Sequence, residues 1–373
     1  MTMQTALPHQ GQSQRSQFGL GKLPTYAVVI GLAMCVPTQA YDETPRTAIA
    51  NIERLGGKVD YDANVSKLTG ELLLNNAATV KGVYLFGTKL TDTELAGVEQ
   101  LPQLESLDIG STRITDSGLK HLTGLKCLKR LRLPDTLISD EGLANLENLT
   151  SLEFLDLGYT KIGGAGLVHL KGLKRLRELW IGNTKITSAA LKHIGGLRLE
   201  TLLLNDTRID DEGAGYIQSL TQLQTLDLTH TQVTDKGFGN LARCLKEMRN
   251  LWLIGTHVTD VGLTQLNELT QLTVLHLENT KINGDGLKHL KRPSQLVFLG
   301  LHGTKLAGTN LRHLNGLAKL ETLDLTGTEV NDEDLKELKK LPRLQYLDLI
   351  HTKVTDSGIA ELQKAFPDCS IQR

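Results

Sequence analysis

The stretch Leu320–Thr328 reads LETLDLTGT, and its spacing recurs along most of the 373-residue chain. Apolar residues stand eight, five and three positions before Thr328, and Val330 follows it by two. The interval between successive copies is 24 residues, apart from one of 23 and one of 25. The threonines in this register are Thr88, Thr112, Thr136, Thr160, Thr184, Thr207, Thr231, Thr256, Thr280, Thr304, Thr328 and Thr352. A sustained period of this size indicates a stacked repeat architecture.

Each repeat has two halves with different hydrophobic periods. The L-x-L half before the threonine alternates apolar and polar residues, which predicts a short strand. The other half begins with a polar pair such as Thr115-Asp116, usually followed by a glycine, and then carries leucines three apart, as at Leu119, Leu122 and Leu125. This spacing predicts a short helix with one apolar face, whose free amides the polar pair would cap. Neither half can bury its leucines alone, so neighbouring repeats are expected to stack.

The combined pattern LxxLxLxxTxITDxGLxxLxxL resembles the leucine-rich repeat family, over residues 80–371. It looks most like the bacterial subtype with threonine where many families carry asparagine or cysteine, and it is also similar to the repeats of F-box-type ubiquitin-ligase receptors. The resemblance implies an α/β fold: a curved right-handed solenoid of about twelve 24-residue repeats, with a parallel sheet on the concave face and short helices on the convex face. It also implies that each threonine hydroxyl bonds the adjacent turn, which would form a ladder along the array.

The ends of the array carry their own patterns. Thr44-Pro45 precedes a helical pattern that Gly56-Gly57 ends, and Lys58–Asp62 then favours an extended strand. Residues 41–79 are therefore expected to form an N-terminal cap of one helix and one strand. At the other end, Cys369 follows the last helical pattern and is expected to be buried in a C-terminal cap.

Residues 1–40 have the organisation of a secretory signal. A polar lead with only basic charges precedes the apolar run Tyr26–Val36, and small residues follow at Thr38 and Ala40. This pattern predicts cleavage after Ala40 and export to the periplasm, the cell surface or the medium. The alternatives are a disordered leader with a chance apolar patch, and a lipid anchor through Cys35, which the large Met34 before it disfavours.

Charge and composition exclude several classes of protein. Lysine plus arginine total 41 and aspartate plus glutamate total 42, a balance that argues against a nucleic-acid binder. No apolar stretch approaches the roughly 20 residues of a membrane-spanning helix. The four cysteines are too few and too scattered for a disulfide scaffold.

No catalytic motif emerges from the sequence, and we assign no catalytic, cofactor-binding or metal-binding residue. Gly163–Gly166 is interpreted as a turn of the array rather than a phosphate-binding loop. Five histidines stand nine positions after a repeat threonine, and we interpret them as a solvated helix face because no Cys or acidic residue recurs beside them to complete a metal site. They are His121, His169, His193, His289 and His313.

A binding surface is predicted on the strands. The residues six, four and two positions before each threonine should point out of the leucine core, onto the concave face. Of eleven aromatic residues from the first repeat onward, seven occupy these three positions in 24, which is more than chance would collect there. Exposed aromatic and arginine side chains are typical anchors of protein interfaces, although strands also favour aromatics for packing alone. The candidate protein-binding residues are Tyr84, Phe86, Arg132, Phe154, Asp156, Trp180, Trp252, His276, Phe298, His302 and Tyr346.

The function that these features favour is a non-enzymatic, monomeric, exported module that binds a protein or peptide on its concave sheet, with no nucleic-acid partner and no cofactor. One alternative is a cell-surface or periplasmic structural or adhesin-like protein. Another is an intracellular ubiquitin-ligase-type substrate adaptor, which residues 41–79 disfavour because they are short for an F-box segment.

Overall fold

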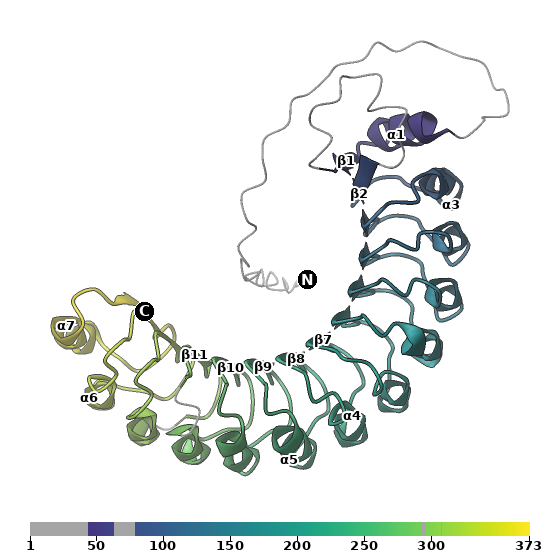
Figure 1. Ribbon diagram of the computed structural model, residues 1–373. Coiled ribbons are helices and arrows are strands. Elements are labelled where there is room, and N and C mark those ends of the chain that lie inside the picture. Colours follow the sequence, from purple (N-terminus) through teal and green to yellow (C-terminus); the bar gives the residue numbers. More distant parts are fainter. Residues whose placement is uncertain (1–43, 63–78, 292–294, 307) are drawn as a thin grey trace, which may run out of the picture. The chain divides into compact units, whose positions relative to one another are not determined.

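The computed structural model describes residues 44–62, 79–291, 295–306 and 308–373 (Figure 1). The predicted signal segment 1–40, with Cys35, lies outside the described residues. The described segments all belong to one compact unit, Glu43–Arg373. None of their helices is both long enough and apolar enough to cross a membrane.

The unit begins with the helix and strand that the sequence predicts. Helix α1 (Pro45–Arg54) starts at Thr44, whose side chain accepts a hydrogen bond from the Thr47 N–H, and Pro45 occupies its first turn. Strand β1 (Lys58–Tyr61) follows and pairs antiparallel with β2 (Val80–Tyr84). Ile49 and Ile52 of α1 are buried. Helix α1 therefore contributes directly to the core of the first repeat.

From β2 onward every strand of the described residues pairs in parallel with the next one along the chain. The strands are β3 (Ser106–Asp108), β4 (Arg130–Arg132), β5 (Phe154–Asp156), β6 (Glu178–Trp180), β7 (Thr201–Leu203), β8 (Thr225–Asp227), β9 (Asn250–Trp252), β10 (Val274–His276), β11 (Phe298–Gly300), β12 (Thr322–Asp324), β13 (Tyr346–Asp348) and β14 (Ser370–Gln372). The predicted solenoid with a parallel sheet is confirmed. Figure 1 shows the strands on the inner side of the array and the helices on its outer side.

Most of the predicted helices are 3₁₀ helices (η) rather than α-helices. They are η3 (Ala96–Gln100), η4 (Gly118–Leu122), η5 (Gly142–Leu146), η6 (Ala165–Gly172), η7 (Ser188–His193), η8 (Gly262–Glu268), η9 (Asp285–Lys291) and η10 (Gly308–Leu314). The α-helices of the array are α3 (Asp92–Leu95), α4 (Asp211–Ile217), α5 (Asp235–Cys244), α6 (Leu335–Leu338) and α7 (Asp356–Ala365). A 3₁₀ helix has three residues per turn, so leucines three apart stay on one face and point at the sheet.

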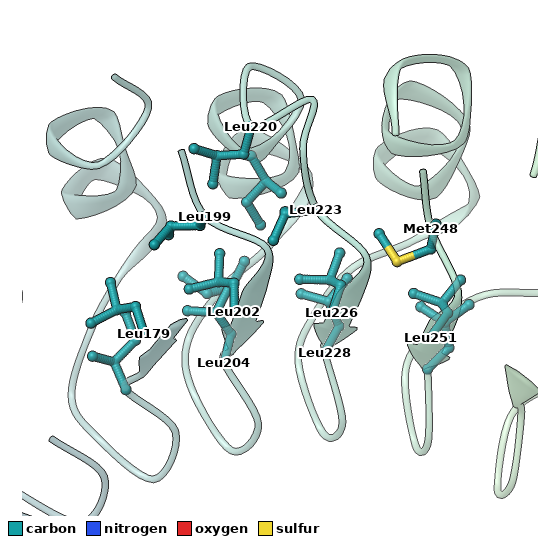
Figure 2. Close-up of a cluster of buried hydrophobic side chains, with 14 of the residues drawn as sticks. Leu179, Leu199, Leu202, Leu204, Leu220, Leu223, Leu226, Leu228, Met248 and Leu251 are labelled. Carbon is teal, nitrogen blue, oxygen red and sulfur yellow. The ribbon is translucent and has the colours of Figure 1, made fainter. Parts of the chain in front are cut away.

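The core is one continuous stack of leucines between the sheet and the helices. Leu179, Leu202, Leu226 and Leu251 occupy the same place on β6, β7, β8 and β9, and all four are buried (Figure 2). Met248 fills a place that leucine takes in other repeats, which suits its flexible side chain. At the C-terminal end Cys369 is buried as predicted, and this burial raises the pKa of its thiol.

The repeat threonines are structural, but the predicted ladder of threonine hydroxyls is wrong. Each of the twelve hydroxyls donates to the carbonyl three residues earlier in its own repeat, at 2.5–2.8 Å. The residue before each threonine has a φ between 50° and 71°. This left-handed residue turns the chain sharply, so the hydroxyl faces the carbonyl of the residue that directly follows its own strand.

Carboxylates of the polar pairs join the repeats instead. Asp235 accepts hydrogen bonds from the Thr259 N–H (2.7 Å), the Thr259 hydroxyl (2.7 Å) and the Gly262 N–H (3.0 Å). The same arrangement links Asp92 to Thr115, Asp116 to Ser139, Asp211 to Thr234 and Asp332 to Thr355. The first residue of the polar pair also caps its own helix as predicted, at Asp210 of α4, Thr234 of α5 and Thr355 of α7. The inter-repeat carboxylates are an addition that the sequence did not predict.

The glycine-rich segment Gly163–Gly166 belongs to the same ladder. Asp140 accepts from the N–H groups of Gly163 (3.0 Å), Gly164 (2.9 Å) and Gly166 (2.9 Å). Three backbone amides here replace the hydroxyl and amide donors of a Thr-Asp repeat. The segment binds a carboxylate of its own chain, which agrees with its interpretation as a turn of the array.

Candidate protein-binding face

The outward face of the sheet consists of three columns of side chains, six, four and two positions before each repeat threonine; we call it the concave face. Parallel pairing one repeat apart places equivalent residues on adjacent strands, so Asp156 neighbours Trp180 and Trp252 neighbours His276. The sequence-predicted candidates thereby come together in these columns.

Accessibility divides the eleven candidates. Phe86 and Tyr346, at the two ends of the array, are exposed, at 53% and 58%. Seven side chains are partly exposed: Tyr84, Arg132, Trp180, Trp252, His276, Phe298 and His302. Phe154 and Asp156 are buried, at 1% and 4%, so the expectation that they are presented to a partner is corrected.

Phe154 is buried because two neighbouring side chains cover its ring. The Arg130 guanidinium lies 4.1 Å from the ring centroid, and the Trp180 ring packs edge-on at 4.9 Å. Arg130 precedes Phe154 by one repeat and Trp180 follows it by slightly more than one. The group is a cross-strand packing cluster rather than a set of three independent anchors.

Arg132 bridges two carboxylates in the same region. Its guanidinium lies 3.0 Å from Asp108 Oδ2 and 3.4 Å from Asp156 Oδ2. Burial raises the pKa of Asp156, against the opposing effects of the Gly158 N–H and of Arg132. Arg132 is thus shared between two carboxylates of neighbouring strands.

A second aromatic cluster lies on β9, β10 and β11. The Trp252 and His276 rings stack at 5.5 Å with an interplanar angle of 11°, and His276 meets Phe298 at 4.4 Å. All three side chains are only partly buried. His276 Nδ1 also lies 2.6 Å from Glu278 Oε1. The candidates predicted from the sequence did not include Glu278, although its position two residues before Thr280 places it in an outward column.

Charge differs between the two halves of the concave face. In the columns of β3 to β6, Arg130 and Arg132 accompany the acidic residues Asp108, Asp156 and Glu178. In the columns of β8 to β13 there are four carboxylates and no lysine or arginine. These carboxylates are Asp227, Glu278, Asp324 and Asp348. The second half of the face therefore favours a cationic group over an anionic one, and this again disfavours nucleic acid.

An open depression of about 610 Å³ lies at the C-terminal end of the sheet. Glu321, Arg343, Tyr346 and Asp368 are among its lining residues. Exposed Tyr346 thus stands at the edge of a recess and not on a flat surface.

The helix side offers no metal site in the described ranges, where no group of three or more His, Cys, Asp or Glu residues could hold a metal ion. Acidic partners do occur beside two of the repeat histidines, contrary to the sequence argument. Glu99 lies 2.6 Å from His121 Nδ1, and Glu147 lies 3.3 Å from His169 Nδ1. Each glutamate comes from the preceding repeat. These are exposed surface pairs of the kind that contributes little to stability.

Comparison with known proteins agrees with this geometry. The family model described as leucine-rich repeat matches residues 100–122, 148–170, 219–242 and 316–339. No curated protein matches the sequence. An internalin from Listeria monocytogenes is among the most similar solved structures, with 23% identity and a TM-score of 0.62, over 88% of this chain and 94% of that chain. The mouse RP105/MD-1 complex contains another, with 21% identity and a TM-score of 0.58, over 73% of this chain and 47% of that chain.

Both similarities concern the fold. The four family matches fall in phase with the threonine register, and the strands and helices follow that register along the whole array. The chain has the leucine-rich repeat fold, and four of its repeats match the leucine-rich repeat family model.

Proposed function

We propose that this chain is an exported, monomeric, non-enzymatic binding protein that holds a protein or peptide on its concave face. The observation that carries the proposal is the cluster of Trp252, His276 and Phe298, which lies partly exposed on the outer side of a sheet whose inner side is a complete leucine core. Large aromatic side chains with few rotatable bonds are the usual centres of protein interfaces. The core does not require these three side chains, so their solvent-facing surface is available to a partner.

Two further observations support this proposal. The mouse neighbour was solved as a complex, RP105 with MD-1, and the bacterial one is an internalin. The apolar run Tyr26–Val36, followed by small residues, is typical of a secretory signal.

Trp252 is the better residue for testing the proposal. Trp180 covers buried Phe154, so its removal would uncover an apolar ring and confuse binding with stability. Trp252 stacks on His276, which remains packed against Phe298 when the indole is removed. A displayed random-peptide library should be selected on immobilised full-length protein, and the selected peptides measured against Trp252→Ala and Lys288→Ala.

We expect Trp252→Ala to weaken the selected peptides by more than about 30-fold, the size of an interface hot spot. Lys288 is exposed on the helix side, so Lys288→Ala should leave binding unchanged. If only Lys288→Ala weakens peptide binding, the peptides bind on the helix side, and the proposal that the concave face is the binding surface is wrong.

Export has a separate test. The N-terminal sequence and mass of the protein recovered from its native cells should begin at Tyr41 if the signal is removed after Ala40. A native protein that retains residues 1–40 would contradict a cleaved signal, and an added diacylglyceryl mass on Cys35 would show the lipid-anchored form.

A further inference from the structure

Glu278 is the most unusual carboxylate of the concave face. It is 9% exposed, and Oε1 lies 2.6 Å from His276 Nδ1. The other oxygen, Oε2, is buried and finds no hydrogen-bond partner among the described residues. A buried acceptor without a donor is costly, and such groups are rare in folded proteins. Glu278 therefore has an unmet hydrogen-bonding capacity on the binding face.

Gly300 on β11 explains where this carboxylate lies. A Cβ atom added to Gly300 would stand 2.0 Å from Glu278 Oε1 and 3.0 Å from Oε2. Gly300 is the one glycine in the column four positions before the repeat threonines, all of which the structure describes. The Glu278 carboxylate thus occupies surface space that a side chain fills on the other strands. It is therefore part of the concave side of the sheet.

Aromatic rings stand beside this carboxylate. His276 contacts it directly and lies between Trp252 and Phe298. A cation is attracted both to a carboxylate and to the faces of aromatic rings. The surrounding columns from β8 to β13 add Asp227, Asp324 and Asp348 without any lysine or arginine. The neighbouring aromatic rings and the surrounding carboxylates therefore both favour a cationic group at this place.

We propose that the Glu278 subsite, made of Glu278, Gly300, Trp252, His276 and Phe298, receives an arginine or lysine side chain of the bound protein or peptide. The basic group pairs with the Glu278 carboxylate and packs against the aromatic cluster. This proposal rests on the proposed concave-face binding and adds the chemical class of the partner's anchor residue.

The test uses four mixtures of otherwise randomised nonapeptides with the central residue fixed as arginine, lysine, citrulline or norleucine. Immobilised full-length protein should retain the arginine and lysine mixtures about ten-fold better than the citrulline mixture, since citrulline keeps the shape of arginine without its charge. Glu278→Gln should reduce this preference to less than about two-fold. Glu329→Gln is the matched control, because it removes the same charge from an exposed glutamate paired with Lys353 and should leave the preference unchanged.

A second variant tests the position of the Glu278 carboxylate without changing the charge of the protein. Gly300→Ala keeps every carboxylate but places a methyl group where the Glu278 carboxylate lies, so it should also abolish the preference. Circular dichroism of each variant confirms that it is folded. Equal retention of the arginine and citrulline mixtures by the wild-type protein, or an undiminished preference in folded Glu278→Gln, overturns the basic anchor.

The two proposals fail in different ways. If all four mixtures bind equally and Trp252→Ala weakens them all, the concave face binds its partner without a basic anchor. If the mixtures bind and Trp252→Ala weakens none of them, the concave-face function fails and the subsite fails with it.

Discussion

At the scale of single residues, each repeat threonine serves its own turn. The hydroxyl of Thr231 donates to the Leu228 carbonyl at 2.7 Å, and the Thr231 N–H donates to the same carbonyl at 3.1 Å. The threonine is 2% exposed. This doubled contact closes the loop after the strand, and it recurs at Thr88, Thr256, Thr304, Thr328 and Thr352.

Replacing Thr231 with valine tests the hydroxyl alone. Valine keeps the branched shape but removes one of the two donors to the Leu228 carbonyl, so we expect a loss of about 1 kcal/mol in the free energy of unfolding. Urea unfolding beside the exposed Lys288→Ala variant measures it. Equal midpoints for the two variants would show that the hydroxyl contributes nothing.

Asp227 should give the protein a stability that depends on pH. Burial raises the pKa of Asp227, partly offset by hydrogen bonds from Thr229 and by His276. The unfolded carboxyl keeps its ordinary value near 3.8 and loses its proton first, so stability falls as the pH rises from there through the folded-state pKa. Asp227→Asn removes the free-energy cost of burying a charged carboxylate. The asparagine amide oxygen can still accept a hydrogen bond from the Thr229 N–H, which lies 2.8 Å from Asp227 Oδ1 in the wild type.

We therefore expect Asp227→Asn to unfold at higher urea concentration than the wild type at neutral pH. The advantage should disappear below pH 3.8, where both side chains are neutral. Urea titrations at a series of pH values measure the difference. A variant that is less stable than the wild type at neutral pH would contradict the argument.

At the scale of the elements, each helix is positioned by the repeat before it. Asp211 accepts from the Thr234 N–H, the Thr234 hydroxyl and the Gly237 N–H, and so holds the start of α5. A Cβ atom on Gly237 would stand 2.3 Å from Asp211 Oδ1. The glycine that follows the polar pair is needed because a carboxylate of the neighbouring repeat approaches its backbone closely.

Two glycines of α5 allow a matched test of whether the Asp211 carboxylate requires glycine at position 237. Gly237→Ala should lower the free energy of unfolding by about 1–3 kcal/mol, because the methyl group would displace the Asp211 carboxylate. Gly239→Ala, two residues on, meets only Gln265 Cγ at 3.6 Å and should raise it by up to about 1 kcal/mol through helix propensity. Thermal or urea unfolding compares them. A similar effect of both substitutions would mean that the carboxylate moves aside at little cost.

At the scale of the whole array, each repeat contacts mainly its neighbours. Strand pairs, stacked helices and the carboxylate ladder all join residues about one repeat apart. Stability in such an array is the sum of local repeat terms and nearest-neighbour terms. Damage at one end should therefore weaken that end first.

Ile49→Asp places an unpaired charge at a fully buried site of α1. Hydrogen exchange measured by mass spectrometry should then show lost protection in α1, β2 and β3, with β10 to β13 close to the wild type. Trp180→Ala serves as the comparison in mid-array, where the loss should centre on β5 and β6. Uniform loss of protection in the Ile49→Asp variant would instead show that the array unfolds as a single unit.

The repeated pattern by itself determined the number and position of the strands in the array and the buried leucines. The separate patterns at the two ends predicted the helix at Thr44-Pro45 and the burial of Cys369. These features follow from local periodicity, since alternation or a spacing of three decides which side of an element is apolar. The outward columns of the concave face followed from the same alternation.

Only the tertiary structure decided which outward residues are available and which polar groups meet. Phe154 is buried because Arg130 and Trp180, each about one repeat away, close over it. Glu278 lies against Gly300, and Asp235 caps the helix after Thr259. Both contacts form because the stacking of repeats brings residues 22–27 positions apart together. Periodicity states which face a side chain is on, but its neighbour from the next repeat depends on how the repeats stack in space.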